Sequence, residues 1–426
     1  MSLLKPCMLN NSTIMKTYRL SITLLALCVF IAFSCKNSTS ADTSGDTTGV
    51  TDTEITIGAW GPMTGPAALW GTIVKGTDAY FKMINEEGGI NGRKINFIFK
   101  DDAYDPSRTV PAVRELVQRD EIFAVAGGIG TATNMAVSGF LEENNVPWIS
   151  PMTGATHWTH PTKENIFTSF PLYFDEGEIM ANYAINDLDI KNIGIIYQND
   201  DFGKSGLVGA KNILKKNNLD FVAELPVEIA DTDLSSHVAR LKEAGAEAVL
   251  LWVLPRQAAI ILGSSAVVDF NPEFMATLAL SDLTLMHDIT KGAWEGVYFT
   301  YVGETMFNDE SHPMMMKYKE AFAKYYPDDR WGTFSAAGFM WIEPMVEGLK
   351  RAGKDLTRES FLEAMSTIKN HMTTSGLPIT FSKENHLGTR SLCIMKCISG
   401  TEAEKVSNLI SSESDVSELI TMLEED

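Results

Sequence analysis

Residues 192–253 decide the fold, and they read NIGIIYQNDDFGKSGLVGAKNILKKNNLDFVAELPVEIADTDLSSHVARLKEAGAEAVLLWV. Three apolar runs in this stretch predict strands, and the segments between them predict helices. In chain order the expected elements are strand 192–198, helix 204–217, strand 220–227, helix 232–244 and strand 246–253. Strands that alternate with helices of about 10–15 residues are typical of βαβ units, which form parallel sheets. The stretch therefore predicts an α/β fold.

The same alternation continues on both sides of this stretch. The other expected strands are 54–60, 94–100, 121–128, 146–150, 165–170, 273–280 and 296–302, with short ones near 377–381 and 391–398. The other expected helices are 67–87, 107–119, 131–144, 175–187, 256–268, 310–325, 332–352 and 358–369. Asp105-Pro106 is a strong helix start, and Gly245 is expected to close helix 232–244. One sheet with this many strands would be unusually wide, so we expect two lobes, each with its own sheet.

The N-terminus has the pattern of a secretory leader. The charged residues before Cys35 are Lys5, Lys16 and Arg19. Residues 20–33 (LSITLLALCVFIAF) carry no charge, and this run is too short to span a membrane. A basic start followed by such a run is typical of a signal peptide, so we expect residues 1–34 to be removed. Met15 is an alternative start, because Met15-Lys16 would open a signal of normal length.

Residues 32–35 (AFSC) resemble the lipobox of bacterial lipoproteins, in which the Cys is acylated through its sulfur and becomes the new N-terminus. Ser34 fits the cleavage position, whereas Phe33 is bulky for this motif. The following segment is rich in Ser, Thr, Gly and Asp, and we expect residues 35–52 to form a disordered tether. The resemblance implies lipidation of Cys35; the alternative is a plain secretory signal beside an incidental Cys.

The charge balance argues against nucleic acid as a partner. The 426 residues include 35 Lys and Arg against 55 Asp and Glu, for a net charge of -20. Such an acidic chain repels phosphate backbones. No stretch reaches the roughly 18 uncharged apolar residues of a spanning helix, which excludes a polytopic membrane protein.

The five cysteines do not predict a disulfide framework. Cys7 and Cys28 belong to the leader, and Cys35 is assigned to the lipid. Cys393 and Cys397 lie four residues apart in a strand-like run, which would hold them about 13 Å apart. That distance is too long for a disulfide, so we expect two buried free thiols.

Ligands of open α/β sheets bind beyond the carboxyl ends of strands, against helix N-termini. Three loops rich in small residues or Pro stand at such places, at residues 61–71, 127–134 and 150–156. Trp70 ends the first loop and is either a wall of the site or part of the core. Thr131 adds a hydroxyl to the N–H groups of a helix start, which favour an anion; the alternative is an ordinary helix cap.

The sequence carries no recognisable catalytic, cofactor-binding or metal-binding motif. The glycines of residues 128–133 lack the third Gly of a dinucleotide site, and neither a P-loop nor a Gly-x-Ser-x-Gly elbow is present. We interpret His157 and His160 as a fortuitous pair rather than a metal site. The three Asp residues within 101–105 are interpreted as loop and cap residues. We therefore expect no enzyme activity, no cofactor and no metal.

Six short blocks between Glu54 and Lys396 carry a family resemblance. They are Gly61-Pro62-x-Thr64-Gly65-Pro66, Asn85-x-x-Gly88-Gly89-Ile90-Asn91-Gly92-Arg93, Asp101-Asp102-x-x-Asp105-Pro106, Val146-Pro147 to Ser150-Pro151, Tyr197 to Gly203, and Asp233-Leu234 to Lys242. In this order and spacing they resemble the type I periplasmic binding proteins of ABC transporters, in the branched-chain amino-acid (leucine/isoleucine/valine-binding) family.

The resemblance implies two Rossmann-like lobes of the Venus-flytrap form, joined by a hinge with three crossings. The crossings would lie near Phe170–Tyr173, Tyr301 and Gly376. The implied parts are lobe I at 53–172 and 301–375, lobe II at 173–300 and 376–400, and an acidic tail at 401–426.

The resemblance also implies a site between the lobes. In the family, a hydroxyl and N–H groups at the position of Thr131 bind the carboxylate of the solute, together with the loop that matches Met152 to Gly154. An aromatic ring at the position of Trp70 walls the side chain of the solute, and Ala132 is a further implied ligand-binding residue. The remaining implied ligand-binding residues are Met152, Thr153, Gly154, Tyr173, Phe202, Leu278 and Phe334.

The chain departs from the family where the ligand's ammonium would bind. The amino-acid binders place acids at the positions matching Tyr173 and Leu278, and neither residue is acidic here. A slip of the alignment by one or two residues would put Asp175 or Asp282 in that role. An unpaired buried ammonium is costly, so we favour a ligand with an anionic or amide end and an apolar or aromatic body.

The resemblance implies a lipid-anchored, extracytoplasmic and monomeric solute-binding protein that works with the permease subunits of an ABC importer. It would be held to the membrane by its lipid and would have no enzyme activity. The alternative is a ligand-sensing receptor or amide sensor of the same fold, with no role in transport.

Overall fold

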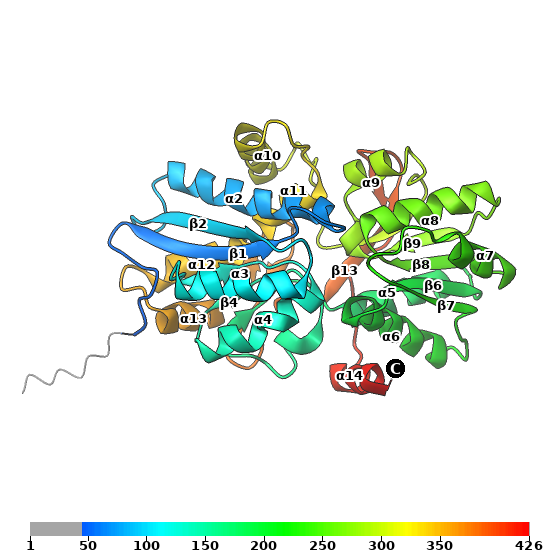
Figure 1. Cartoon of the computed structure of the whole chain (residues 1–426), viewed down its shortest axis with the longest axis horizontal. Helices are drawn as coiled ribbons and strands as arrows, with labels where there is room; N and C mark the ends of the chain where they lie inside the picture. The colour runs from blue at the N-terminus through cyan, green and yellow to red at the C-terminus, as the bar shows by residue number, and fades with distance from the viewer. Residues whose placement is uncertain (1–44, 426) are drawn as a thin grey trace, which may run out of the picture. The chain divides into compact units, whose positions relative to one another are not determined.

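The computed structural model describes residues 45–425, which form two α/β lobes joined side by side (Figure 1). The expected leader, with Cys7, Cys28 and Cys35, lies outside the described residues, as does the expected tether up to Ser44. Within the described residues, no helix is long and apolar enough to cross a membrane. The predicted α/β fold with two lobes is confirmed.

Lobe I is built on a parallel sheet with the strand order β2-β1-β3-β4-β5. Its strands are β1 (Glu54–Gly61), β2 (Lys94–Asp101), β3 (Ala124–Ala126), β4 (Trp148–Ile149) and β5 (Ile166–Phe167). Its helices are α2 (Gly71–Glu86), α3 (Pro106–Gln118), α4 (Thr131–Glu143), α10 (Pro313–Tyr325), α11 (Thr333–Met340), α12 (Glu343–Ala352) and α13 (Arg358–Ser366), with 3-10 turns at Ala68–Trp70 and Thr156–Trp158. The short strands β11 (His371–Met372) and β12 (Pro378–Ile379) form a separate pair.

Lobe II is built on a sheet with the order β14-β13-β10-β9-β8-β6-β7, in which β15 also pairs with β13. Its parallel strands are β6 (Ile193–Gln198), β7 (Ala223–Val227), β8 (Ala248–Trp252), β9 (Glu273–Ala276) and β10 (Tyr298–Tyr301). The antiparallel additions are β13 (Ser391–Cys397), β14 (Ala403–Lys405) and β15 (Ile410–Ser411). Its helices are α5 (Tyr173–Asn186), α6 (Asp201–Lys216), α7 (Ser235–Glu243), α8 (Pro255–Val267), α9 (Leu283–Ile289) and α14 (Val416–Glu425), with a 3-10 turn at Leu278–Leu280.

Several local expectations are confirmed. The strand expected over 246–253 is present as β8, and all its residues are buried, which is typical of a strand with helices on both faces of its sheet. The Asp105 side chain accepts the N–H of Ser107 and caps α3, which has Pro106 in its first turn. Gly245 follows α7 with a φ of 71°, a conformation that glycine adopts without strain. Cys393 and Cys397 are free and buried.

Several expected elements are shorter in the structure, and the cause is clear for two of them. The helix expected over 332–352 breaks at Trp341–Ile342, because Pro344 cannot continue a helix from the preceding turn and instead stands in the first turn of α12. The strand expected over 273–280 ends at Ala276. There the Thr277 side chain accepts the N–H of Ala279 and starts the 3-10 turn.

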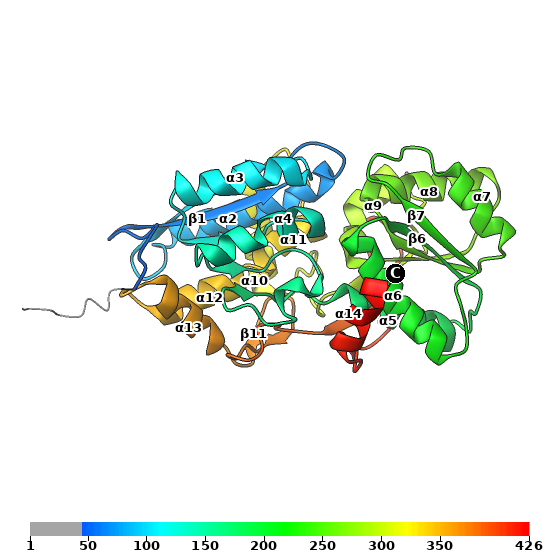
Figure 2. The same ribbon diagram turned by 60° about the horizontal axis from the view of Figure 1, so that its bottom comes forward.

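The ends of the expected domains also differ. Residues 45–52, which we expected in a disordered tether, are part of the folded unit: Asp46 pairs with the buried Arg358 at 2.8 Å, and Val50 bridges Ile55. Residues 401–425 of the expected acidic tail 401–426 are largely structured, because they supply β14, β15 and α14 to lobe II. Figure 2 shows α14 beside α5 and α6.

The third crossing lies later in the chain than Gly376, so the assignment of residues 376–400 to lobe II is wrong for its first part. Phe381 packs edge-on against Phe167 of lobe I, with ring centroids 5.3 Å apart. The Gly388 N–H then donates to the carbonyl of Thr168 at 2.7 Å. The chain therefore leaves lobe I after Gly388, because the ring contact of Phe381 and the hydrogen bonds of Thr168 hold the preceding residues on that lobe.

Candidate ligand-binding site

A cavity lies between the two lobes, where loops from the strand ends of both sheets meet. Its empty volume is about 420 Å³, counting space open to solvent. The lining residues are Trp70, Ile73, Tyr104, Ile129, Gly130, Thr131, Met152, Phe170, Tyr173, Phe202, Leu278, Ala279, Phe334 and Trp341. Seven of the lining residues are aromatic, so the walls suit an apolar or aromatic ligand body.

The structure brings most of the expected site residues together at this cavity. Those that line it are Trp70, Thr131, Met152, Tyr173, Phe202, Leu278 and Phe334. Ala132, Thr153 and Gly154 are not among the lining residues. Thr153 and Gly154 are buried behind the wall, whereas Ala132 is half-buried in the first turn of α4. Fewer polar groups therefore line the cavity than the resemblance implies.

The polar corner of the cavity is formed by the hydroxyl of Thr131 at the start of a helix, with the hydroxyl of Thr153 behind it. Thr131 is the first residue of α4, and its Oγ1 lies 2.6 Å from Oγ1 of Thr153. The N-cap is Gly130, which has no side chain to cap the helix, so Thr131 is not the cap. Gly130 has a φ of 104°, and a Cβ there would come within 2.4 Å of the Tyr104 ring. Only glycine therefore fits this turn beside the cavity.

Trp70 belongs both to the wall and to the core, so the two interpretations of this residue coincide. Its side chain is 5% exposed and packs in the main apolar cluster. Its ring meets Tyr104 and Phe202 edge-on, at centroid distances of 5.5 and 6.3 Å. The indole Nε1 of this lobe I residue donates to the carbonyl of Ala279 in lobe II at 2.9 Å. Trp70 therefore fastens the lobes together at the cavity.

Sequence reasoning missed several lining residues. These are Ile73, Tyr104, Ile129, Gly130, Phe170, Ala279 and Trp341. Tyr104 stands in the loop that we interpreted only as a cap region, and its φ of 63° is unusual for a residue with a side chain. Trp341 stands at the unexpected break between α11 and α12. No simple sequence pattern predicts the positive φ of Tyr104. Pro344 is the one sequence signal for the break before α12.

Neither acid considered as an ammonium partner is free to act as one. The Asp175 carboxylate accepts two hydrogen bonds from Arg390, at 2.8 and 2.5 Å. Asp282 caps α9 through the N–H of Leu285 and also accepts the N–H of Phe334 at 2.8 Å. Among the described residues, no charged side chain lines the cavity. The geometry therefore does not support Asp175 or Asp282 as the partner of a ligand's ammonium.

A third acid, which sequence reasoning missed, stands behind the wall. The Oε1 atom of Glu176 accepts the N–H of Leu278 at 2.5 Å and the hydroxyl of Thr300. Its Oε2 atom has no hydrogen-bond partner among the described residues. Burial raises the pKa of Glu176 from 4.5 to about 7, against the effect of its hydrogen bonds. Glu176 thus holds the turn that carries Leu278 and Ala279.

The site offers no constellation for catalysis or metal binding. Within residues 45–425, no group of three or more His, Cys, Asp or Glu side chains is placed to hold a metal ion. His157 lies 3.9 Å from Asp201, whereas His160 contacts Thr159, so the two histidines have separate partners. The arrangement is a cleft with neutral donors and aromatic walls, which is suited to binding.

A family model described as periplasmic binding protein matches residues 54–402. The chain is 28% identical over 357 residues to Leu/Ile/Val-binding protein homolog 3 of Brucella melitensis, which covers 80% of this chain and 91% of that relative. Among solved structures, a fatty acid ABC transporter substrate-binding protein from Thermomonospora curvata superposes with a TM-score of 0.78 at 26% identity, covering 87% of this chain and 96% of that one.

The fold is also that of a branched chain amino acid ABC transporter protein from Thermus thermophilus with bound valine. That structure has a TM-score of 0.78 and 20% identity, and the match covers 88% of this chain and all of that one. At this level of identity the likeness concerns the fold.

Proposed function

The chain belongs to the periplasmic binding protein family, in the type I branch of the Leu/Ile/Val-binding proteins, and from this premise we propose that it is the lipid-anchored solute-binding subunit of an ABC importer. Proteins of this family bind solutes and are not enzymes, and membership implies an extracytoplasmic location. The ligand is a small molecule with a carboxylate or amide end and an apolar or aromatic body. Closure of the two lobes buries it and prepares it for the permease.

One observation carries this choice of ligand: the cavity has a polar corner of neutral donors and no acid on its walls. The N-terminus of α4 and the hydroxyl of Thr131 favour a carboxylate or a carbonyl. Aromatic rings such as Trp70, Tyr173 and Phe202 line the rest. An α-amino acid would bury its ammonium without an ionic partner, at a cost of several kcal/mol. The fatty acid named for the Thermomonospora curvata relative has the chemistry that we propose, an anionic end and an apolar body.

A thermal-shift screen of matched pairs tests the ligand class. Leucine is compared with 4-methylpentanoate, and phenylalanine with 3-phenylpropanoate, because each pair shares a body and differs in the ammonium. Benzoate and short amides complete the set. We expect stabilisation by members without the ammonium; a ligand at about 100 times its Kd stabilises by about 2.7 kcal/mol, a readily measured rise in Tm.

The same screen can contradict the proposal directly. Stabilisation by leucine or phenylalanine, with no shift from their partners, would mean that an acid moves to the cavity to pair with the ammonium. The expected ligand class would then be wrong, while a solute-binding role would stand.

The membrane anchor is tested at Cys35. The motif AFSC and the uncharged run before it support acylation of this residue, and two or three acyl chains hold a protein stably where one does not. We expect Cys35→Ala to release the protein into soluble fractions or to leave an unprocessed precursor. Cell fractionation and the mass of the mature protein measure both outcomes. Normal processing with unchanged membrane association would contradict the anchor.

A further inference from the structure

The first and third crossings run side by side as they leave lobe I. The N–H of Thr168 donates to the carbonyl of His386 at 2.9 Å, and the N–H of Gly388 donates to the carbonyl of Thr168 at 2.7 Å. Thr168 and Leu387 thus form a parallel bridge between two segments more than 200 residues apart in the chain. These two crossings are therefore hydrogen-bonded to each other on the lobe I side of the hinge.

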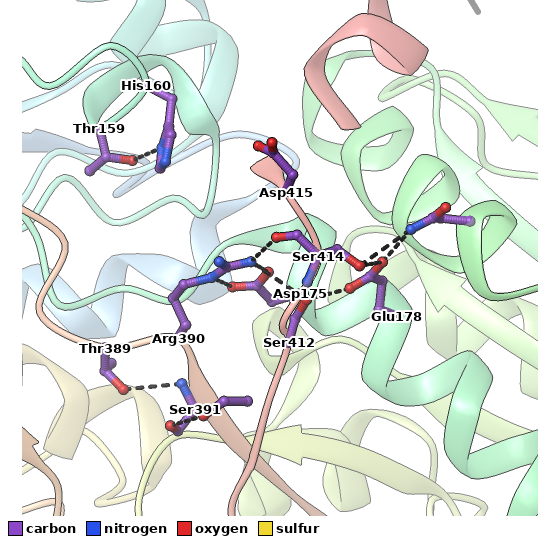
Figure 3. Close-up of polar contacts among 12 residues, drawn as sticks. Thr159, His160, Asp175, Glu178, Thr389, Arg390, Ser391, Ser412, Ser414 and Asp415 are labelled. Carbon is purple, nitrogen blue, oxygen red and sulfur yellow. Dashed lines mark hydrogen bonds and ion pairs between the residues drawn. The ribbon is translucent and has the colours of Figure 1, made fainter. Parts of the chain in front are cut away.

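Arg390 fastens the same two segments on the lobe II side. Its guanidinium donates two hydrogen bonds to the carboxylate of Asp175, which is fully buried at the start of α5 (Figure 3). Asp175 follows the first crossing, and Arg390 ends the third. A bidentate pair between a guanidinium and a carboxylate is among the strongest and most directional of polar contacts.

The C-terminal segment joins this pair. Nη2 of Arg390 also donates to the carbonyl of Ser414 at 3.2 Å (Figure 3). The hydroxyls of Ser412 and Ser414 both donate to the carboxylate of Glu178, one turn beyond Asp175 on α5. The segment is thereby tied to both the arginine of the third crossing and the helix that follows the first.

The apolar face of α14 then covers the crossings themselves. Val416 and Leu419 are 4% and 1% exposed, and they form one cluster with Leu172 of the first crossing and Leu387 of the third. On the lobe I side, His160 is near enough for the charges of Arg390 and Asp415 to act on it. Burial and then the charge of Arg390 lower the pKa of His160, and the charge of Asp415 raises it. The segment therefore lies over the hinge, next to both lobes.

We propose that residues 412–419 form a strap across two of the three hinge crossings, and that Arg390 is the positioning residue that fastens it. The strap limits how far the lobes separate when the cleft is empty, so it biases the protein towards the closed form that captures ligand. This role goes beyond the proposed function and does not depend on the chemistry of the ligand.

Hydrogen–deuterium exchange of the full chain without ligand tests the strap. The variants are Arg390→Ala, Arg390→Lys and the double variant Ser412→Ala/Ser414→Ala. Arg358→Ala is the matched control, because Arg358 is also an arginine that pairs with an aspartate and donates to backbone carbonyls. Its partners are Asp46 and three carbonyls of lobe I, away from the hinge.

We expect Arg390→Ala and the double serine variant to speed exchange in residues 168–172 and 386–391 by about tenfold, which corresponds to local opening that costs about 1.4 kcal/mol less. Small-angle scattering should show a larger radius of gyration for both. Arg390→Lys should restore part of the protection. Arg358→Ala should lower Tm without changing exchange in these two segments.

Unchanged exchange at both crossings in Arg390→Ala would overturn the proposal, as would an equal increase in Arg358→Ala. If Arg390→Ala does not fold, the double serine variant decides alone, because it leaves the buried ion pair of Arg390 and Asp175 intact. None of these outcomes depends on which ligand binds, so the strap can fail while the proposed function stands.

Discussion

Replacing Thr131 by valine should weaken binding of the screened ligand by about 10- to 150-fold, the effect of losing one hydrogen bond to a charged group. Valine keeps the shape of threonine and removes its hydroxyl, which lies in the polar corner of the cavity 2.6 Å from the hydroxyl of Thr153. Isothermal titration at constant pH measures the loss. Thr131→Ser should recover most of the affinity, because it restores the donor.

A neighbouring threonine separates this effect from stability. Thr133 lies on the same turn of α4, is as buried as Thr131, and donates its hydroxyl to the carbonyl of Ile129 at 2.7 Å without lining the cavity. Thr133→Val should lower Tm and leave the affinity nearly unchanged. Equal affinity in Thr131→Val, or a loss no larger than that of Thr133→Val, would reduce Thr131 to a structural residue.

Thr131 and Trp70 could be placed near a site from the sequence because both stand at the end of a loop that follows a predicted strand. The carboxyl ends of parallel strands share one edge of a sheet, so residues at these junctions meet whatever the details of the loops. Phe334 and Leu278 could be predicted as site residues only from the family resemblance. They lie far along the chain, in segments whose lobe and orientation are set by long-range packing. The structure places all four at one cavity.

Tyr104 could not be predicted, because its position depends on a loop held by side chains. The carboxylates of Asp101 and Asp102 accept the N–H groups of Ala103 and Tyr104, respectively. These contacts hold both residues at positive φ and turn the ring of Tyr104 towards the cavity. The sequence indicates a turn at this place, but not where its fourth residue points.

The third crossing was misplaced for a related reason. The bridge between Thr168 and Leu387 joins segments that no local pattern connects, and it keeps residues up to Gly388 with lobe I. Asp175 shows the same limit. Its sequence position made it a candidate for a ligand's ammonium, whereas the folded chain brings Arg390 to it from the other crossing.

Glu176 should make the protein less stable as the pH rises from about 5 to about 8, and Glu176→Gln should remove this contribution. Burial raises the pKa of Glu176 from 4.5 to about 7, so the folded chain keeps this proton at pH values where the unfolded chain has released it. The folded state then binds more protons, and the free energy of unfolding decreases as the pH rises. The loss is about 3 kcal/mol, because each pH unit between the two pKa values costs about 1.4 kcal/mol.

The contribution of Glu176 is measured by comparing the calorimetric Tm values of wild type and Glu176→Gln at pH 5 and pH 8. At pH 5 Glu176 is neutral in the folded state, like glutamine, so wild type and Glu176→Gln should have similar Tm values. At pH 8 the wild-type chain buries a charge whose Oε2 atom has no partner among the described residues, and Glu176→Gln should gain several degrees relative to it. The exposed Glu54→Gln controls for the loss of one formal charge. Parallel pH profiles for wild type and Glu176→Gln would mean that Glu176 is ionised throughout, with the hydrogen bonds from residues such as Leu278 and Thr300 sufficient to hold its charge behind the wall of the cleft.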